Sequence, residues 1–248
     1  MMRTMLSVIL MLGLTAITTA EESGKAGGRQ DEAKAIVSKA AAALKAVKSV
    51  SYTIDYKGTE WIAARVPEIK GTIVMGGRSE HDIDRFFCEL KITPSESSEV
   101  RELSAGSDGN EFFLVDPATK TVHQDMDIAV LGSAGRGIRR ALLREFTDPE
   151  PFDEALQSGA MDLRDETKIG EEECYVVHLK PSDPPEMVWY FAKKDLLPRR
   201  VTRLYMRDDK EGTTEMLLTD VVVNPTFVRS PFKPVVPKGY TQTDDFAP

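Results

Sequence analysis

The chain has 248 residues, of which 41% are hydrophobic and 29% are charged, and its formal net charge at pH 7 is −8. This balance supports a hydrophobic core and excludes a wholly disordered chain. The excess of acidic side chains argues against nonspecific binding to nucleic acid, which requires a basic surface.

The N-terminus is typical of an exported protein. Arg3 precedes an apolar run over residues 5–14, which is short for a membrane span, and small residues lie before Glu21. An uncleaved anchor is the alternative, but the short run favours a signal peptide, residues 1–20, cleaved after Ala20. Cleavage removes only Arg3 from the 32 basic side chains and leaves the 40 acidic ones, so the mature net charge is −9. The absence of a Cys near the cut excludes a bacterial lipoprotein anchor.

A polar, Gly-rich segment and an amphipathic helix are expected next. Residues 21–30 are predicted to form a flexible leader, and Asp31 is a plausible N-cap. Apolar residues then recur at helical spacing and predict a helix up to Ser49: Ala33, Ile36, Val37, Ala40, Leu44 and Val47. Because this stripe is rich in Ala, the helix can lie close to its partner.

Strand signals begin at Val50. Tyr52, Ile54 and Tyr56 alternate with polar residues, which predicts a half-buried strand. Similar signals follow, separated by turn residues, over 69–75, 83–92, 100–105, 112–115 and 121–124. Consecutive strands joined by short turns predict antiparallel pairing.

The pattern becomes helical over residues 127–159. Gly132 to Gly137 looks like a phosphate loop but lacks its Gly-Lys-Ser/Thr ending, so a hinge is predicted. Ile138, Leu142 and Phe146 follow at four-residue spacing, which indicates a helix. Asp148 to Gly159 indicates another short helix.

Strands resume at Met161 and run to Val223, before a Pro-punctuated tail. The order of elements predicts a mainly β (α+β) fold in one domain, residues 31–248. We expect a strongly curved antiparallel sheet, or an unclosed β-barrel, with helices covering its concave side.

No catalytic or metal-binding motif is present in the sequence. His81, His123 and His178 have no partner at metal-ligand spacing, and no nucleophile elbow, zinc or Ca²⁺ loop occurs. The sequence therefore predicts no enzyme activity, no cofactor and no metal. Cys88 and Cys174 could form a disulfide in an exported protein, but both lie in apolar strand patterns, which favours two buried thiols.

Two groups of residues could bind a ligand. Four arginines form a basic face at 136–144, which is either a site for a phosphate headgroup or acidic partner, or the wet side of an amphipathic helix. The apolar strand and helix residues either pack a core or line a cavity, since both arrangements bury one face of the sheet. Residues expected to line the cavity are Tyr52, Ile54, Tyr56, Ile73, Met75, Phe86, Leu90, Trp189 and Phe191, with Ile138 and Leu142 from the helices and Arg139 or Arg140 near a headgroup.

Five segments carry a resemblance to a known family: Ala43–Tyr52, Asp108–Lys120, Val188–Val201, Leu218–Asn224 and Phe232–Tyr240. In order and spacing, the chain resembles the LolA/LolB-like lipoprotein-carrier superfamily over most of its mature length. The resemblance implies an unclosed β-barrel whose open side is plugged by helices, with an apolar cavity between them. Members carry lipoproteins across the periplasm, and relatives bind other lipids or sense envelope stress.

The resemblance therefore implies a non-catalytic lipid or lipoprotein carrier that holds an acyl chain in the half-barrel. Its location would be the periplasm or cell envelope, and its partners a lipid or an acylated protein, with an envelope membrane protein as a further partner. The alternative is an envelope-associated interaction or stress-sensing module without a bound ligand.

Overall fold

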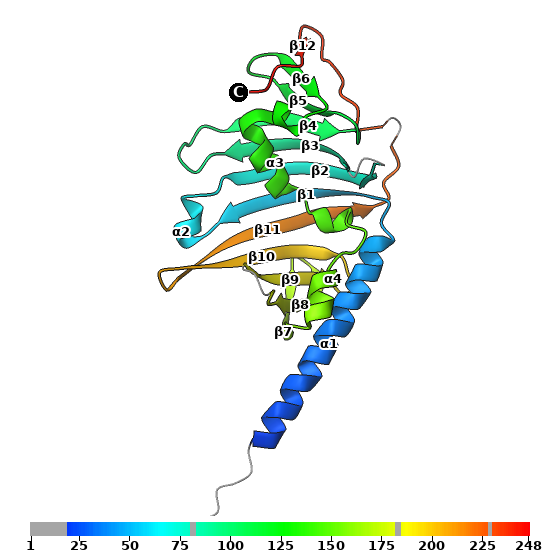
Figure 1. The fold of residues 1–248 in the computed structure, drawn as a ribbon, viewed down its shortest axis with the longest axis vertical. Helices are drawn as coiled ribbons and strands as arrows, with labels where there is room; N and C mark the ends of the chain where they lie inside the picture. The colour runs from blue at the N-terminus through cyan, green and yellow to red at the C-terminus, as the bar shows by residue number, and fades with distance from the viewer. Residues whose placement is uncertain (1–18, 80–82, 182–184, 228–229) are drawn as a thin grey trace, which may run out of the picture.

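The computed structural model describes residues 19–79, 83–181, 185–227 and 230–248, and its strands form one sheet (Figure 1). The strand order is β12-β6-β5-β4-β3-β2-β1-β11-β10-β9-β8-β7. The strands are Ser49–Gly58 (β1), Glu68–Arg78 (β2), Asp84–Thr93 (β3), Arg101–Ser107 (β4), Phe112–Asp116 (β5), Thr121–Asp125 (β6), Met161–Ile169 (β7), Glu172–Leu179 (β8), Glu186–Ala192 (β9), Pro198–Arg207 (β10), Lys210–Val223 (β11) and Thr241–Thr243 (β12).

The sheet consists of two antiparallel meanders joined side by side. Strands β1 to β6 follow one another across one half, β7 to β11 cross the other half, and β1 pairs with β11 between them. Short turns explain each meander, because antiparallel neighbours need only a tight connection. Register shifts at four strand pairs, including β1–β11 between Ser51 and Thr53, add local twist. The expected curved antiparallel sheet is confirmed, with the short parallel pair β12–β6 as an addition.

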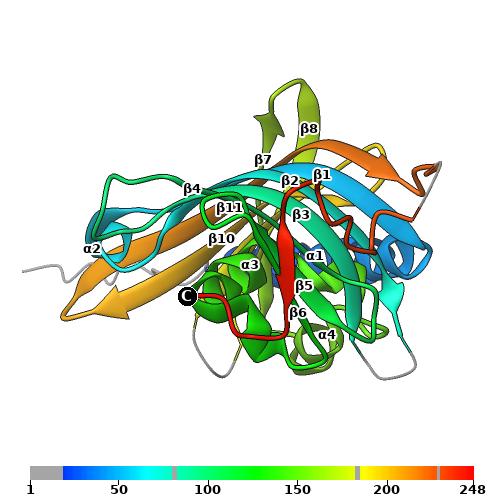
Figure 2. The same cartoon turned by 90° about the horizontal axis from the view of Figure 1, so that it is seen from above.

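This topology determines where the helical segment must lie. Strands β6 and β7 lie near opposite edges of the sheet, so the chain between them has to cross its width. It does so inside the curve, as the view from above shows (Figure 2). The connection contains η1 (Ile128–Ala134), α3 (Gly135–Ala141), η2 (Arg144–Phe146) and α4 (Asp153–Ser158). The prediction that residues 127–159 cover the concave side is confirmed.

Two details of this connection differ from the sequence prediction. The helix containing Ile138 ends at Ala141, and Leu142 is extended, so Phe146 belongs to a separate 3₁₀ turn. The next helix begins at Asp153, after Phe152 in a left-handed conformation with φ 66°, rather than at Asp148. Tertiary contacts override the four-residue spacing at the first break, because the buried Tyr52 hydroxyl bonds the backbone there.

Helix α1 (Thr19–Lys45) covers the β7–β8 end of the sheet together with α4 (Figure 1). The stripe that the sequence predicted faces inward, with Ala33, Ile36, Val37, Ala40 and Leu44 buried. The helix ends at Lys45, so Val47 and the rest of the predicted stretch to Ser49 lie outside it. The helix begins earlier than predicted, so residues 21–30 are helical instead of a separate leader. Glu, Ala and Lys in this segment favour a helix, and Gly27-Gly28 does not interrupt it. Residues 1–18 of the expected signal peptide lie outside the described residues.

The C-terminal tail fastens the helical connection to the sheet edge. The Ala247 N–H donates to the Val130 carbonyl oxygen at 2.9 Å, and a Cβ on Gly132 would clash with the Ala247 carbonyl. Gly132 has φ 52°, so the Gly run predicted as a hinge provides close backbone approach here. Sequence analysis predicted neither β12 nor the short helix α2 (Glu60–Ala63).

The core lies between the concave sheet face and the helices. One cluster of buried hydrophobic residues includes side chains from α1, both meanders and the connection. Cys88 belongs to it, whereas Cys174 lies in a second small cluster with Ile169 and Ala192. Both thiols are buried and free, as the strand patterns predicted. That residues 31–248 form one independently folding domain stays a prediction.

Candidate ligand-binding site

Among the described residues, three of the clefts between the sheet and the helical connection share lining residues. The first, which we call the apolar cleft, has a volume of about 390 Å³, within the usual range for small-ligand pockets. Its floor comes from β3 and β5 and its roof from η1 and α3. It is lined by Ile83, Asp84, Phe86, Phe112, Ile128, Leu131, Ile138, Arg139, Leu142 and Arg144. The lining is mostly aliphatic and aromatic, so this cleft suits a hydrocarbon chain.

The second, the basic cleft, has a volume of about 300 Å³. It forms where the C-terminal end of α3 meets the inner face of β1 and β10. Its lining residues are Tyr56, Arg139, Arg140, Leu142, Arg144, Glu145, Arg203 and Tyr205. Four guanidinium groups against one carboxyl group make this cleft strongly positive on a protein whose net charge is negative.

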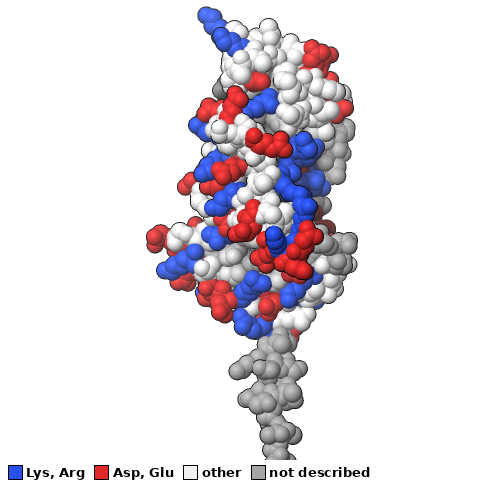
Figure 3. Space-filling view, turned by 90° about the vertical axis from the view of Figure 1, so that its left-hand side faces the viewer, with Lys and Arg blue, Asp and Glu red and all other residues white. Residues whose placement is uncertain are grey.

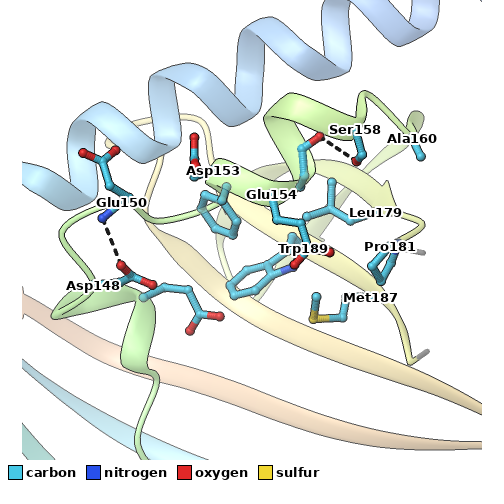
Figure 4. Close-up of a pocket in the computed structure, with 13 residues that line it drawn as sticks. Asp148, Glu150, Asp153, Glu154, Ser158, Ala160, Leu179, Pro181, Met187 and Trp189 are labelled. Carbon is cyan, nitrogen blue, oxygen red and sulfur yellow. Dashed lines mark hydrogen bonds between the residues drawn. The ribbon is translucent and has the colours of Figure 1, made fainter. Parts of the chain in front are cut away.

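The third, the acidic-rimmed cleft, has a volume of about 230 Å³ and lies beside α4 (Figure 4). Trp189, Leu179, Pro181 and Met187 form its floor, and Glu154 points toward Trp189 from α4. The remaining lining residues are Glu145, Asp148, Glu150, Phe152, Asp153, Ala155, Ser158 and Ala160. The indole of Trp189 packs edge-on against Phe152 at 4.8 Å between ring centroids.

The clefts share walls along the stretch from the last turn of α3 to η2. Leu142, Arg139 and Arg144 line both the apolar and the basic cleft. Glu145 lines both the basic and the acidic-rimmed cleft. Residues 139–145 therefore separate three spaces that would join if this segment moved away from the sheet.

Tyr52 holds this separating segment against the sheet. Its buried hydroxyl accepts a hydrogen bond from the Leu143 N–H at 3.1 Å and lies 3.3 Å from the Ala141 carbonyl oxygen, to which it can donate. The ring also stacks on Phe146 at 5.9 Å between centroids. Burial raises the pKa of the Tyr52 hydroxyl, so it stays protonated and able to donate.

Glu145 places a carboxyl group in the wall between the basic and the acidic-rimmed cleft. It is half-buried between two clefts, and burial raises its pKa, opposed by the nearby Arg203 and Arg144. The charged form is thus disfavoured by desolvation, even though two guanidinium groups lie near it.

The residues that the sequence analysis expected to line one cavity are divided among the three clefts and the core. Phe86, Ile138 and Leu142 line the apolar cleft, Tyr56 and the two arginines the basic cleft, and Trp189 the acidic-rimmed cleft. The others are buried in the core and line none of these three clefts: Tyr52, Ile54, Ile73, Met75, Leu90 and Phe191. Binding of a ligand by any of them stays a prediction.

Sequence reasoning missed several cleft residues. Phe112 and Leu131 line the apolar cleft from elements that the sequence analysis treated only as a strand and a link. Arg203 and Tyr205 line the basic cleft from β10. Their alternation with Val201 was a usable signal, because residues two apart in a strand share a face and Val201 is fully buried.

The histidines are engaged by neighbouring groups within the described residues. His178 Nδ1 lies 2.7 Å from an Arg164 guanidinium nitrogen, and its Nε2 lies 2.7 Å from a Glu186 oxygen. Burial and Arg164 lower the pKa of His178. His123 Nδ1 contacts the Asp245 carbonyl oxygen at 2.9 Å, and His81 lies outside the described residues. Across the part of the chain that the structure describes, no group of three or more His, Cys, Asp or Glu side chains could hold a metal ion.

Comparison with solved structures shows the fold. LprF from Mycobacterium bovis matches with a TM-score of 0.51 at 9% identity, over 82% of this chain and 98% of that chain. A LolA superfamily protein from Nitrosomonas europaea matches at 10% identity over 78% and 94% of the two chains, with a TM-score of 0.32. A structure of the Pseudomonas aeruginosa MucA/MucB complex matches at 12% identity over 82% and 61%, with a TM-score of 0.44.

No protein-family model and no curated protein sequence matches the chain. The likeness to LprF is one of fold, and it agrees with the LolA-like open half-barrel that the sequence resemblance implied. Among the described residues, no helix is long and apolar enough to cross a membrane.

Proposed function

We propose that this protein is an exported, non-catalytic carrier that holds an acyl chain of a lipid or acylated protein in the apolar cleft. The observation that carries the proposal is the cleft itself, a space of about 390 Å³ bounded mainly by hydrocarbon side chains. At roughly 30 Å³ per water molecule, this is room for about 13 waters, which such a surface binds poorly.

Its position between sheet and connection supports the same function. The roof belongs to a connection that contains two short 3₁₀ turns and two short α-helices instead of one long helix. Such a segment can shift by small changes at its turns, while the sheet keeps its strand pairing. An acyl chain could then enter at Leu142 without disturbing the sheet.

The signal-like N-terminus supports a location in the periplasm or cell envelope, where lipids and acylated proteins need shielding from water. There an envelope membrane protein could deliver or accept the ligand. The similarity to LprF supports the fold, and the carrier function is tested on this chain directly.

Binding can be measured with N-phenyl-1-naphthylamine, a neutral fluorophore that brightens in apolar sites, and with dodecyl maltoside as a neutral competitor. We expect saturable fluorescence that dodecyl maltoside reverses. Ile128 lines the cleft and is 38% exposed, so Ile128→Trp should fill the cleft without disturbing the core and weaken binding at least fivefold, or about 1 kcal/mol.

Val100→Trp is the matched control, because Val100 is also exposed and aliphatic but lines none of the three clefts. It should bind the fluorophore as the wild type does. The proposal fails if the wild type shows no saturable binding, or if the two Trp variants behave alike.

A further inference from the structure

The inner face of the sheet changes character toward one end of β1, β10 and β11. Met216 and Val201 are opposite one another in the register of β10 and β11, and both are fully buried. Two residues further along, the opposite pair is Arg203 and Thr214, on the same face. A guanidinium group thus points to the side on which the hydrophobic core lies.

Two further guanidinium groups lie near that of Arg203, and both come from α3. Arg139 and Arg140 in the last turn of α3 line the same basic cleft. Within the described residues, none of these three arginines forms a salt bridge, whereas Arg144 has Asp84 at 3.4 Å. Figure 3 shows Lys and Arg side chains gathered at mid-height, toward the side on which the helices lie. Three arginines without a salt bridge among the described residues, around a hollow with Glu145 as its single carboxyl group, indicate a site for an external anion.

The hydroxyl of Tyr56 adds a neutral donor to these guanidinium groups. The Tyr56 hydroxyl lies in this cleft, where burial raises its pKa and Thr214, Arg140 and Arg203 oppose the rise. Thr214 is 2% exposed, lies beside the Tyr56 hydroxyl, and is not among the residues that line the cleft.

The basic cleft also adjoins the apolar cleft across Leu142. Arg139 and Arg144 line both spaces, so a ligand with its chain in one can place its polar end in the other. Glu145 is the single carboxyl group in the basic lining, against four guanidinium groups.

We propose that the basic cleft recognises the phosphate headgroup of an amphiphile whose chain occupies the apolar cleft. Arg139, Arg140 and Arg203 would supply the charge, and the Tyr56 hydroxyl would bond one of the oxygens. A phosphate fits this set better than a carboxylate, since it offers more oxygens and more charge to several guanidinium groups. This inference rests on the proposed acyl-chain function and names its ligand class.

The test compares dodecyl phosphate with dodecyl maltoside as competitors of N-phenyl-1-naphthylamine, both below their micelle concentrations. The two share a chain and differ in headgroup. In the wild type, we expect dodecyl phosphate to bind about 10-fold more tightly, a gap that narrows as salt is raised. Arg140→Gln and Arg203→Gln should remove most of this gap and leave dodecyl maltoside unchanged.

Arg136→Gln is the matched control, because Arg136 lies on α3 but does not line the basic cleft. It should change dodecyl phosphate binding by no more than about twofold, the size of a surface charge effect. Arg140→Gln carries the test alone if Arg203→Gln fails to fold, because Arg140 is half-exposed and does not line the apolar cleft. Thermal melts of each variant establish folding before binding is compared.

The remaining outcomes separate the two proposals. Equal binding of both competitors in the wild type overturns headgroup recognition and leaves the carrier proposal standing. If the fluorophore does not bind to the wild type, the carrier proposal is refuted. Inorganic phosphate, titrated by calorimetry, should bind far more weakly than dodecyl phosphate. If inorganic phosphate instead binds as tightly as dodecyl phosphate, and Arg203→Gln weakens that binding, the cleft is a free-phosphate site and the proposed amphiphile is wrong.

Discussion

Removal of the Tyr52 hydroxyl should loosen the segment that separates the three clefts. In Tyr52→Phe the ring and its stacking on Phe146 remain, but the Leu143 N–H loses the acceptor that lies 3.1 Å away. Leu143 is fully buried, so water cannot replace the lost partner. An unpaired buried donor costs about 1–3 kcal/mol, and we expect unfolding free energy to fall by that amount.

Urea denaturation at neutral pH measures this loss, and hydrogen exchange of the Leu143 amide locates it. For a chain of this size, the melting temperature should fall by about 2–4 °C per kcal/mol. Tyr190→Phe is the control, since the Tyr190 hydroxyl has no hydrogen bond among the described residues and its ring faces Arg200. The reasoning is refuted if both variants unfold alike and Leu143 exchanges no faster in Tyr52→Phe.

Three further predictions follow from burial. Trp189→Ala should lose about 3–5 kcal/mol in urea denaturation, because the indole is fully buried against Phe152 and Phe191; a loss below about 1 kcal/mol would indicate an open cavity instead. Burial raises the folded-state pKa of Glu145 above its unfolded value of about 4.3, so unfolding free energy falls as pH rises from the unfolded pKa through the folded one. Glu145→Gln should flatten this pH dependence in urea denaturation, and an unchanged pH profile would contradict the prediction. Burial raises the pKa of Cys88 to about 12 and also raises that of Cys174, so iodoacetamide should label both only on unfolding, and rapid native labelling or a Cys88–Cys174 peptide would be evidence against this.

The strands were predictable because each meander needs only local information. The alternation of Tyr52, Ile54 and Tyr56 with polar residues fixes which side chains face the core, and β1 buries those three. Pairing of β1 with β11 joins residues more than 150 positions apart, and no local pattern specifies it.

The clefts were predictable only in part. Four-residue spacing predicted a continuous helix through Leu142, but the Tyr52 hydroxyl breaks it there and creates the shared wall. Periodicity identifies which residues are buried, but it does not tell a packed side chain such as Ile73 from a cleft residue such as Phe86. The basic cleft combines α3 with β10, so its composition follows from the crossing of the connection over the sheet.

Photolabelling tests the central claim, an acyl chain held in the apolar cleft, most directly. A dodecyl maltoside analogue with a diazirine at the chain end would be bound, irradiated and mapped by peptide mass spectrometry, with excess dodecyl maltoside as competitor. The account predicts competable labels within 83–86 and 128–144 and at Phe112, which contain the residues that line the cleft. Labels confined to the convex face, or labelling that the competitor does not reduce, would contradict it.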